Sequence, residues 1–90
     1  MIIVYTKDFC PYCDGAKGYL KKIGEPFEAV NITNNPEMRE WLVKQGHKTL
    51  PQIYYRDKLL VEGGFTGLSA LLPSDIESRK DAINQSLLTE

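Results

Sequence analysis

Short apolar runs alternate with stretches of helical periodicity along the first half of the chain. Residues 2–6 (IIVYT) and 27–32 (FEAVNI) are rich in β-branched and aromatic residues. Runs of this length and composition are typical of buried strands. Between them the apolar residues recur at helical spacing, which predicts a helix that begins near the cysteines and ends at Gly24, before Pro26. The apolar positions of this helix are Ala16, Tyr19, Leu20 and Ile23.

A second helix is predicted after the second strand. Asn35 suits the N-cap position, and Pro36 suits the first turn, where no backbone N–H is needed. Gly46 ends the pattern, and the apolar face consists of Met38, Trp41 and Leu42, which we expect in the core. The order strand, helix, strand, helix predicts two parallel strands joined by a crossover.

The second half of the chain predicts a hairpin. Residues 52–55 (QIYY) and 59–62 (LLVE) have the composition of strands, and only three polar residues separate them. So short a link favours an antiparallel pair. Because side chains alternate along a strand, we expect one of Tyr54 and Tyr55 to face solvent.

Two helices are expected after the hairpin. Gly63-Gly64 interrupts the strand pattern, and a short helix from about Thr66 to Leu72 is expected to end at Pro73. The segment SDIE, residues 74–77, resembles a capping box and predicts a last helix through Leu88. The order β-α-β-α-β-β-α indicates an α/β protein with a small mixed four-stranded sheet flanked by helices. Residues 1–90 are expected to form a single domain, with 74–90 as a C-terminal helix or tail.

Composition and charge exclude several classes of function. The chain has 90 residues, a hydrophobic fraction of 42% and a net charge of −1, values that indicate a globular domain. It has no basic run, so we expect no nucleic-acid partner. No apolar run is long enough to cross a bilayer, and residues 1–10 lack the pattern of a signal peptide. We therefore expect no membrane partner.

The two cysteines, Cys10 and Cys13, are the only ones in the chain. Half of a metal site, a structural staple or a reversible redox pair can explain such a pair. A staple across so short a span removes little unfolded-state entropy, and small secreted domains use several disulfides. Both points favour a protein of the reducing cytoplasm over a secreted protein with a structural disulfide. A structural zinc site needs four ligands, and His47, the only histidine, is expected to be an exposed loop residue.

The redox interpretation has a direct physical argument. Cys10 is expected just before the first helical turn, where free backbone N–H groups and the helix dipole favour a thiolate. Lys7 adds a positive charge nearby, and Pro11 is tolerated in the first turn. Cys13 lies one turn further, on the same face but deeper, so the two sulfurs can form a bridge. We expect Cys10 to be an exposed nucleophile and Cys13 its buried resolving thiol.

Three segments, YTKDFCPYCDGAK, TLPQIY and GGFTGL, occur in this order and together resemble glutaredoxins over residues 1 to about 72. CPYC is the common dithiol active site of that family, whose short members occur in bacteria and phages. The resemblance implies a thioredoxin-like fold. It also implies a glutathione-dependent thiol–disulfide oxidoreductase that reduces protein disulfides and glutathione mixed disulfides and carries electrons to cellular reductases.

The resemblance also implies roles for individual residues. Cys10 would attack the substrate disulfide and Cys13 would resolve the mixed disulfide. The Leu50–Pro51 peptide would be cis and would expose the main chain of Leu50, with which glutathione can pair as an added strand. The glutathione-binding residues implied are Lys7, Tyr12, Thr49, Leu50, Pro51, Gly64, Phe65 and Thr66.

One position departs from the family pattern. Thr66 suits the N-cap of the short helix, and backbone N–H groups near Thr66 and Gly67 are expected to hold the γ-glutamyl carboxylate. Glutaredoxins often carry an acidic residue at one of these two positions, where it meets the amino group of glutathione. Neither residue is acidic here. The strength of glutathione binding is therefore open.

Two alternative functions remain. A dimer can hold a glutathione-ligated [2Fe–2S] cluster, although Pro11 stiffens the active-site turn and disfavours it. The protein can also be a thioredoxin-like carrier that does not use glutathione. In the preferred interpretation the protein is a monomer without a bound metal. Its partners are glutathione and disulfide-containing or glutathionylated proteins, and ribonucleotide reductase is a common client of the family.

Overall fold

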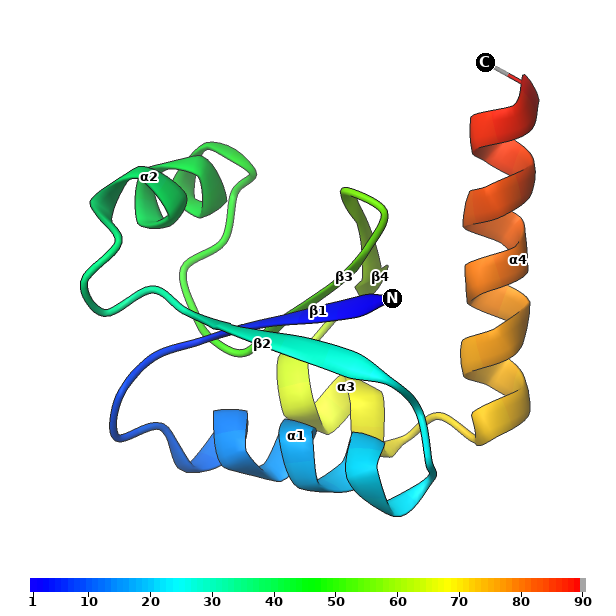
Figure 1. The fold of residues 1–90 in the computed structure, drawn as a ribbon, viewed down its shortest axis with the longest axis horizontal. Helices are drawn as coiled ribbons and strands as arrows, with labels where there is room; N and C mark the ends of the chain where they lie inside the picture. The colour runs from blue at the N-terminus through cyan, green and yellow to red at the C-terminus, as the bar shows by residue number, and fades with distance from the viewer. Residues whose placement is uncertain (90) are drawn as a thin grey trace.

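A computed structural model describes residues 1–89 as a four-stranded sheet covered by helices (Figure 1). The order of elements predicted from the sequence is confirmed, including the last helix. The elements are β1 (Ile2–Thr6), α1 (Pro11–Lys22), β2 (Phe27–Asn31), α2 (Pro36–Lys44), β3 (Gln52–Tyr55), β4 (Lys58–Val61), α3 (Gly64–Ser69) and α4 (Pro73–Thr89).

The sheet is mixed, as predicted, with the strand order β2-β1-β3-β4. Strands β1 and β2 are parallel and are joined by the α1 crossover, whereas β3 is antiparallel to both β1 and β4. The register pairs Tyr5, near the end of β1, with Gln52, at the start of β3. The segment that follows β1 and the segment that precedes β3 therefore meet at the same edge of the sheet, and these two segments carry Cys10 and Pro51.

Each face of the sheet has its own apolar core. Because side chains alternate along a strand, Ile2 and Val4 of β1 face α1 and α3, and Tyr5 faces α2 on the other side (Figure 1). The first core is completed by Ala16 and Leu20 of α1, Leu68 of α3 and Ile76 of α4, among others. The second core contains Tyr5, Ile32, Leu42 and Tyr54, with Met38 and Trp41 packed against it, as expected for the apolar face of α2.

The two tyrosines of β3 correct one expectation, because neither faces open solvent. Tyr54 is buried against Tyr5 and Trp41, with ring centroids 5.6 Å and 5.3 Å away. Tyr55 is half-buried on the opposite face, where Lys80 of α4 lies 5.8 Å from its ring centroid. Helix α4 covers Tyr55, and the periodicity of a strand does not show where a helix predicted elsewhere in the chain will pack.

His47 corrects a second expectation, because it is not an exposed loop residue. It is half-buried, its Nε2 lies 2.6 Å from the Tyr54 hydroxyl, and its ring meets that of Tyr54 edge-on. Burial lowers the pKa of His47 below its ordinary value. The polar partner that makes this burial possible comes from the next strand, so the sequence around His47 gives no sign of it.

The predicted hairpin is present with a tighter turn. Arg56 and Asp57 alone form it, both with left-handed φ values of 52° and 66°, and Tyr55 pairs with Lys58. Positive φ at both turn residues matches the right-handed twist of two-residue hairpins. The second strand accordingly begins one residue earlier than predicted.

Helix boundaries in the last third of the chain also differ from the prediction. Gly63, with a φ of 83°, is the N-cap of α3, and Thr66 lies inside the helix. Pro73 opens α4 instead of ending α3, because proline at the first helical position loses no hydrogen bond. The side chain of Asp75 accepts a 2.9 Å hydrogen bond from the Leu72 backbone N–H, so the predicted capping box at Ser74 is not the cap.

Helix α4 stands at the β4 side of the sheet and continues past it (Figure 1). Ile76 is completely buried, Arg79 donates a 3.1 Å hydrogen bond to the Leu60 carbonyl, and Lys80 forms an ion pair with Glu25 after α1. These contacts attach α4 to β4 and to the segment that follows α1. Across residues 1–89, no helix is both long and apolar enough to cross a membrane.

Candidate functional site

Cys10 and Cys13 are joined by a disulfide at the start of α1. Cys10 is the N-cap residue, Pro11 follows it in the first turn, and the Cys13 backbone N–H donates a 3.2 Å hydrogen bond to the Cys10 Sγ. This N–H is one of those that a helix leaves without an internal partner at its start. The same contact would stabilise a thiolate on Cys10 after reduction.

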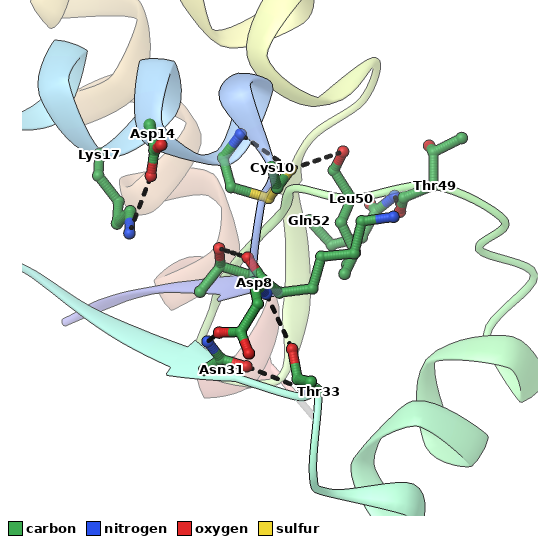
Figure 2. Close-up of a disulfide and its surroundings, with 12 residues drawn as sticks. Asp8, Cys10, Asp14, Lys17, Asn31, Thr33, Thr49, Leu50 and Gln52 are labelled. Atoms are coloured by element: carbon green, nitrogen blue, oxygen red, sulfur yellow. Dashed lines mark hydrogen bonds and ion pairs between the residues drawn. A yellow bond between two sulfur atoms is a disulfide. The ribbon is translucent and has the colours of Figure 1, made fainter.

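The two sulfurs differ in exposure less than expected. Cys13 is 0% exposed, as predicted for the deeper thiol, but Cys10 is only 6% exposed. The segment before β3 covers it, and the Leu50 carbonyl oxygen lies 4.0 Å from the Cys10 Sγ (Figure 2). Cys10 is therefore recessed beside the main chain of Leu50.

The segment before β3 is fixed by its neighbours. The Leu50–Pro51 peptide bond is cis, which confirms the expectation, and Pro51 is fully buried. The buried Gln52 side chain donates a 2.8 Å hydrogen bond from Nε2 to the Thr49 carbonyl (Figure 2). Because this buried amide is hydrogen-bonded to the main chain at Thr49, the adjacent Leu50 backbone is held in one position beside the disulfide.

The segment between β1 and α1 is held by a small polar network. Asp8 donates its backbone N–H to Thr33 Oγ1 at 2.8 Å and accepts a 2.8 Å bond from Asn31 Nδ2 at its carboxylate. Asn31 Oδ1 in turn accepts from the Thr33 backbone N–H. Figure 2 shows these three residues together on the β2 side of the disulfide. Phe9 follows in a left-handed conformation, with a φ of 55°, and its side chain is fully exposed.

A cavity of about 200 Å³ lies beside the disulfide. It brings together seven of the eight residues that the glutaredoxin resemblance implies for glutathione, and Lys7 is the exception. Tyr12 is the exposed aromatic of this set, and Phe65 packs towards α1, where Gly15 leaves room for its ring. The lining residues are Tyr12, Thr49, Leu50, Pro51, Gly63, Gly64, Phe65 and Thr66.

A second cavity of about 640 Å³ adjoins the first at Thr49 and Leu50. Lys7 lies in its wall, so the two cavities together contain all eight implied residues. Four separate segments form this cavity, namely those before α1, after β2, along α2 and before β3. Its lining residues are Lys7, Asp8, Phe9, Ile32, Thr33, Arg39, Leu42, Val43, His47, Lys48, Thr49 and Leu50.

The backbone geometry at the start of α3 determines which position can carry an acidic side chain. A Cβ atom added to Gly67 would lie 1.8 Å from the Glu62 carbonyl oxygen, so position 67 accepts no side chain. The Gly67 N–H also donates to the Gly63 carbonyl, so it is not free for a carboxylate, contrary to expectation. The N–H groups without an acceptor inside this helix belong to Gly64, Phe65 and Thr66.

Sequence reasoning missed several residues that shape this site. Asp8, Asn31 and Thr33 position the segment before Cys10, Gln52 positions Thr49, and Arg39 lines the large cavity. Only Gln52 carried a signal, because it follows Pro51 directly. The partners of the others come from distant segments. In residues 1–89, no group of three or more His, Cys, Asp or Glu side chains is placed to hold a metal ion, and the shared [2Fe–2S] alternative stays a prediction.

A Cys-x-x-Cys pair at a helix N-terminus, beside a cis-proline at the same edge of a mixed four-stranded sheet, defines the class of thiol–disulfide exchange domains with a thioredoxin-like fold. Comparison with known proteins narrows this class. The family profile described as glutaredoxin matches residues 2–60. The chain belongs to the glutaredoxin family, a family of oxidoreductases whose members generally use glutathione.

Individual relatives agree with this assignment. Glutaredoxin 3 of Escherichia coli is 42% identical over 52 residues, which are 57% of this chain and 63% of that protein. The match thus spans less than two thirds of the length of this relative. The glutaredoxin of Pseudomonas aeruginosa is 37% identical over 71 residues, 78% of this chain and 82% of its own.

Solved structures support the fold. The NrdH-redoxin of Escherichia coli, described as a glutaredoxin-like protein with a thioredoxin-like activity profile, has a TM-score of 0.67 and 31% identity. That likeness covers 80% of this chain and 95% of the NrdH-redoxin. Glutaredoxin from Brucella melitensis has a TM-score of 0.65 and 34% identity, over 91% of this chain and 85% of its own.

Proposed function

We propose that this protein is a glutathione-dependent thiol–disulfide oxidoreductase that reduces protein disulfides and glutathione mixed disulfides. The observation that carries the proposal is the disulfide at the N-terminus of α1, with the Cys13 N–H directed at the Cys10 Sγ and a groove along Leu50 beside it. Cys10 is the nucleophile, because its sulfur receives that N–H and is the less buried of the two. Cys13 is the resolving thiol.

The chemistry is a two-electron exchange. The Cys10 thiolate attacks one sulfur of the substrate disulfide, forms a mixed disulfide and releases the other sulfur as a thiolate, which takes a proton from water. Cys13 then attacks the Cys10 sulfur, closes the Cys10–Cys13 bridge and releases the reduced substrate. One glutathione thiolate reopens the bridge at Cys10, and a second removes the bound glutathione as glutathione disulfide. Both electrons come from the two glutathione molecules.

Glutathione fits the small cavity and the part of the large cavity next to it, at Thr49, Leu50 and Lys7. Its main chain pairs with Leu50 as an added strand, which places its cysteine next to Cys10. The γ-glutamyl carboxylate meets the free N–H groups of Phe65 and Thr66 at the small cavity. Lys7, in the wall of the large cavity, meets the glycine carboxylate at the other end.

The place of action follows from the chemistry. A thiol pair reduced by glutathione works in a reducing compartment, so we place the protein in the cytoplasm, where the small number of cysteines is also usual. Glutathionylated and disulfide-containing proteins are its partners, and ribonucleotide reductase is a candidate client through the family. The protein acts as a monomer, and the reaction needs no bound metal.

Single-cysteine variants test the proposal in two assays. Cys10→Ser should abolish the reduction of both protein disulfides and glutathione mixed disulfides, because no nucleophile remains. Cys13→Ser should keep most deglutathionylation, since glutathione itself releases a glutathionylated Cys10. It should lose most protein disulfide reduction, which depends on an intramolecular second thiol at high effective concentration. Activity that survives in Cys10→Ser would show that the roles are reversed.

A second candidate function has its own support. The likeness to an NrdH-redoxin with a thioredoxin-like activity profile, together with the missing acidic residue at Thr66, favours a carrier that thioredoxin reductase reduces directly. The oxidised protein can be offered glutathione with glutathione reductase in one assay and thioredoxin reductase in another. If thioredoxin reductase reduces the protein and glutathione does not, thioredoxin reductase is the electron donor. The roles of the two cysteines would be unchanged.

A further inference from the structure

The large cavity beside the disulfide has an apolar wall that glutathione has no side chain to fill. Ile32 and Leu42 are buried at this wall, Leu50 is half-buried, and Val43 on α2 is 62% exposed. A volume of about 640 Å³ exceeds that of the small cavity more than threefold. A cavity of this size with a partly exposed apolar wall suits the large apolar side chain of a polypeptide.

Phe9 extends this apolar surface to within one residue of the reactive sulfur. Its side chain is fully exposed and its φ is 55°, a conformation that bulky residues rarely adopt. The hydrogen bonds of Asp8 to Asn31 and Thr33 hold the preceding residue in place. A strained residue that presents an aromatic ring to solvent beside a reactive group points to a contact made with a partner.

The charges around the cavity define the partner further. Lys7, Arg39 and Lys48 line it, and all three residues are exposed. Arg39 is fixed in the wall, because its guanidinium donates to the carbonyls of Ile32 and Thr33, at 3.3 Å and 2.6 Å. Within residues 1–89, Asp8 is the one acidic residue of the lining, so three cations stand against one carboxylate. The rim is therefore cationic and complements carboxylates.

We propose that this cavity is a docking site for the polypeptide around the substrate cysteine. It takes a large apolar side chain against Val43 and Leu42, and the cationic rim takes acidic residues that flank it. The inference rests on the proposed function, because it names the protein substrates of the same disulfide site. It also separates the two kinds of substrate, since glutathione uses the Leu50 edge and Lys7, whereas a polypeptide also uses the apolar wall of the cavity at Leu42 and Val43.

Binding can be tested without any redox chemistry. Three ten-residue peptides with serine in place of the substrate cysteine are titrated into the ¹⁵N-labelled wild-type protein. The first has leucine two positions on either side of the serine and aspartate elsewhere, the second has alanine for leucine, and the third has lysine for aspartate. We expect the first to shift the amide signals of Phe9, Val43 and Lys48, and the second and third to bind about tenfold more weakly. Equal binding of all three peptides, or shifts confined to Gly63–Thr66, would overturn the proposal.

A matched pair of variants tests the effect on turnover. Val43→Asp should lower kcat/KM about tenfold for the cysteine version of the first peptide, as a disulfide dimer with dithiothreitol as the final reductant. Its activity on a small glutathione mixed disulfide should be unchanged. Leu72→Asp adds the same charge at an equally exposed leucine, 65% exposed and outside both cavities, and should change neither activity.

The outcomes separate this inference from the proposed function. Equal losses on both substrates for Val43→Asp, or no loss on either, would overturn the docking site and leave glutathione dependence standing. A selective loss on the peptide, in a protein that glutathione fails to reduce, would support the docking site and overturn glutathione dependence. Far-UV circular dichroism of each variant confirms the fold, and the peptide titration uses the wild type alone.

Discussion

Thr66 is the residue at which a single charge can change the affinity for glutathione. It is exposed in the first turn of α3 and lines the small cavity, and the neighbouring Gly67 accepts no side chain. Thr66→Asp should lower the apparent KM for glutathione up to about fivefold, which is the range for one exposed ion pair. Coupled kinetics at low salt measure the change, and Thr66→Asn is the control for shape without charge.

The dependence of the KM for glutathione on salt concentration shows whether the charge added in Thr66→Asp interacts with glutathione. If the charge acts on the amino group of glutathione, the gain in Thr66→Asp should shrink as ionic strength rises, because exposed charges are screened. Equal KM values for Thr66→Asp and Thr66→Asn would mean that the carboxylate does not reach the ligand. The absence of an acidic residue at position 66 would then not weaken the binding of glutathione.

His47 links stability to pH. Burial lowers its pKa in the folded protein, so between that value and the ordinary one, about 6.5, the unfolded chain binds more protons than the folded one. The free energy of unfolding should therefore be unaffected by His47 above this window and should fall as pH decreases through it. Urea denaturation at pH 7.5 and pH 5.5 (two conditions chosen to lie on roughly either side of the ordinary value) measures the difference.

The control for this prediction is His47→Gln. Since His47 is the only histidine, and carboxylates titrate at lower pH, the variant should lose most of the dependence in this range. Tyr54→Phe should keep the dependence and lower stability at both pH values, because it removes the hydroxyl at 2.6 Å from Nε2. The same pH dependence in His47→Gln as in the wild type would rule His47 out as its source.

At the scale of elements, Lys80 attaches α4 to the rest of the fold. Its pKa is raised, chiefly by the hydrogen bond to Glu25, with Glu77 adding to the effect. The Lys80 and Glu25 side chains are only 18% and 13% exposed, so the pair is well shielded from water. Lys80→Met should lower the free energy of unfolding by about 1–2 kcal/mol, between the values for exposed and buried pairs. Urea denaturation measures it.

Lys44→Met is the matched control. Lys44 and Glu40 form an ion pair at 3.5 Å, but both side chains are about 70% exposed, so its loss should cost about 0.5 kcal/mol or less. Disulfide reduction should be unchanged in both variants, because neither Lys80 nor Lys44 lines the cavities at the disulfide. Equal destabilisation by the two variants would show that the Lys80 pair has no special role.

Elements set by local rules were predictable, and those set by distant contacts were not. The Asn35 cap is confirmed, since its Oδ1 accepts from the Met38 N–H three residues on, and the helix start at Cys10 follows from a similar local signal. The start of α3 at Gly64 and of α4 at Pro73 depends on which of several turn residues the packed chain uses. Of the four segments around the large cavity, one lies just before α2 and another just after it. The positions of their residues along the sequence do not reveal that these two segments line the same cavity.

The molecule as a whole should unfold as one unit. Both apolar cores share β1 and β3, because alternate residues of these strands face opposite sides of the same sheet. Trp41, the only tryptophan, reports on the α2 side, whereas far-UV circular dichroism reports on all helices. The two signals should give coincident urea transitions. An earlier transition by tryptophan fluorescence would show that the α2 side opens separately and that residues 1–90 are not one cooperative domain.

The position of β2 at the edge of the sheet has a consequence for behaviour at high concentration. An open strand edge offers unpaired backbone groups to a second chain, and short or charged edge strands resist such pairing. β2 has five residues, and the exposed Glu28 is its only charged one. In a parallel, in-register pair of two such edges, the negative charge of Glu28 would lie against its own copy, and like charges directly opposite each other are destabilising. A Glu28→Val substitution, for example, would change the strand sequence to FVAVN. The face that carries residues 28 and 30 would then present two β-branched side chains and no charge, a pattern that favours growth into fibres. We therefore expect this single carboxylate, remote from the disulfide, to limit edge-to-edge association of the protein at high concentration.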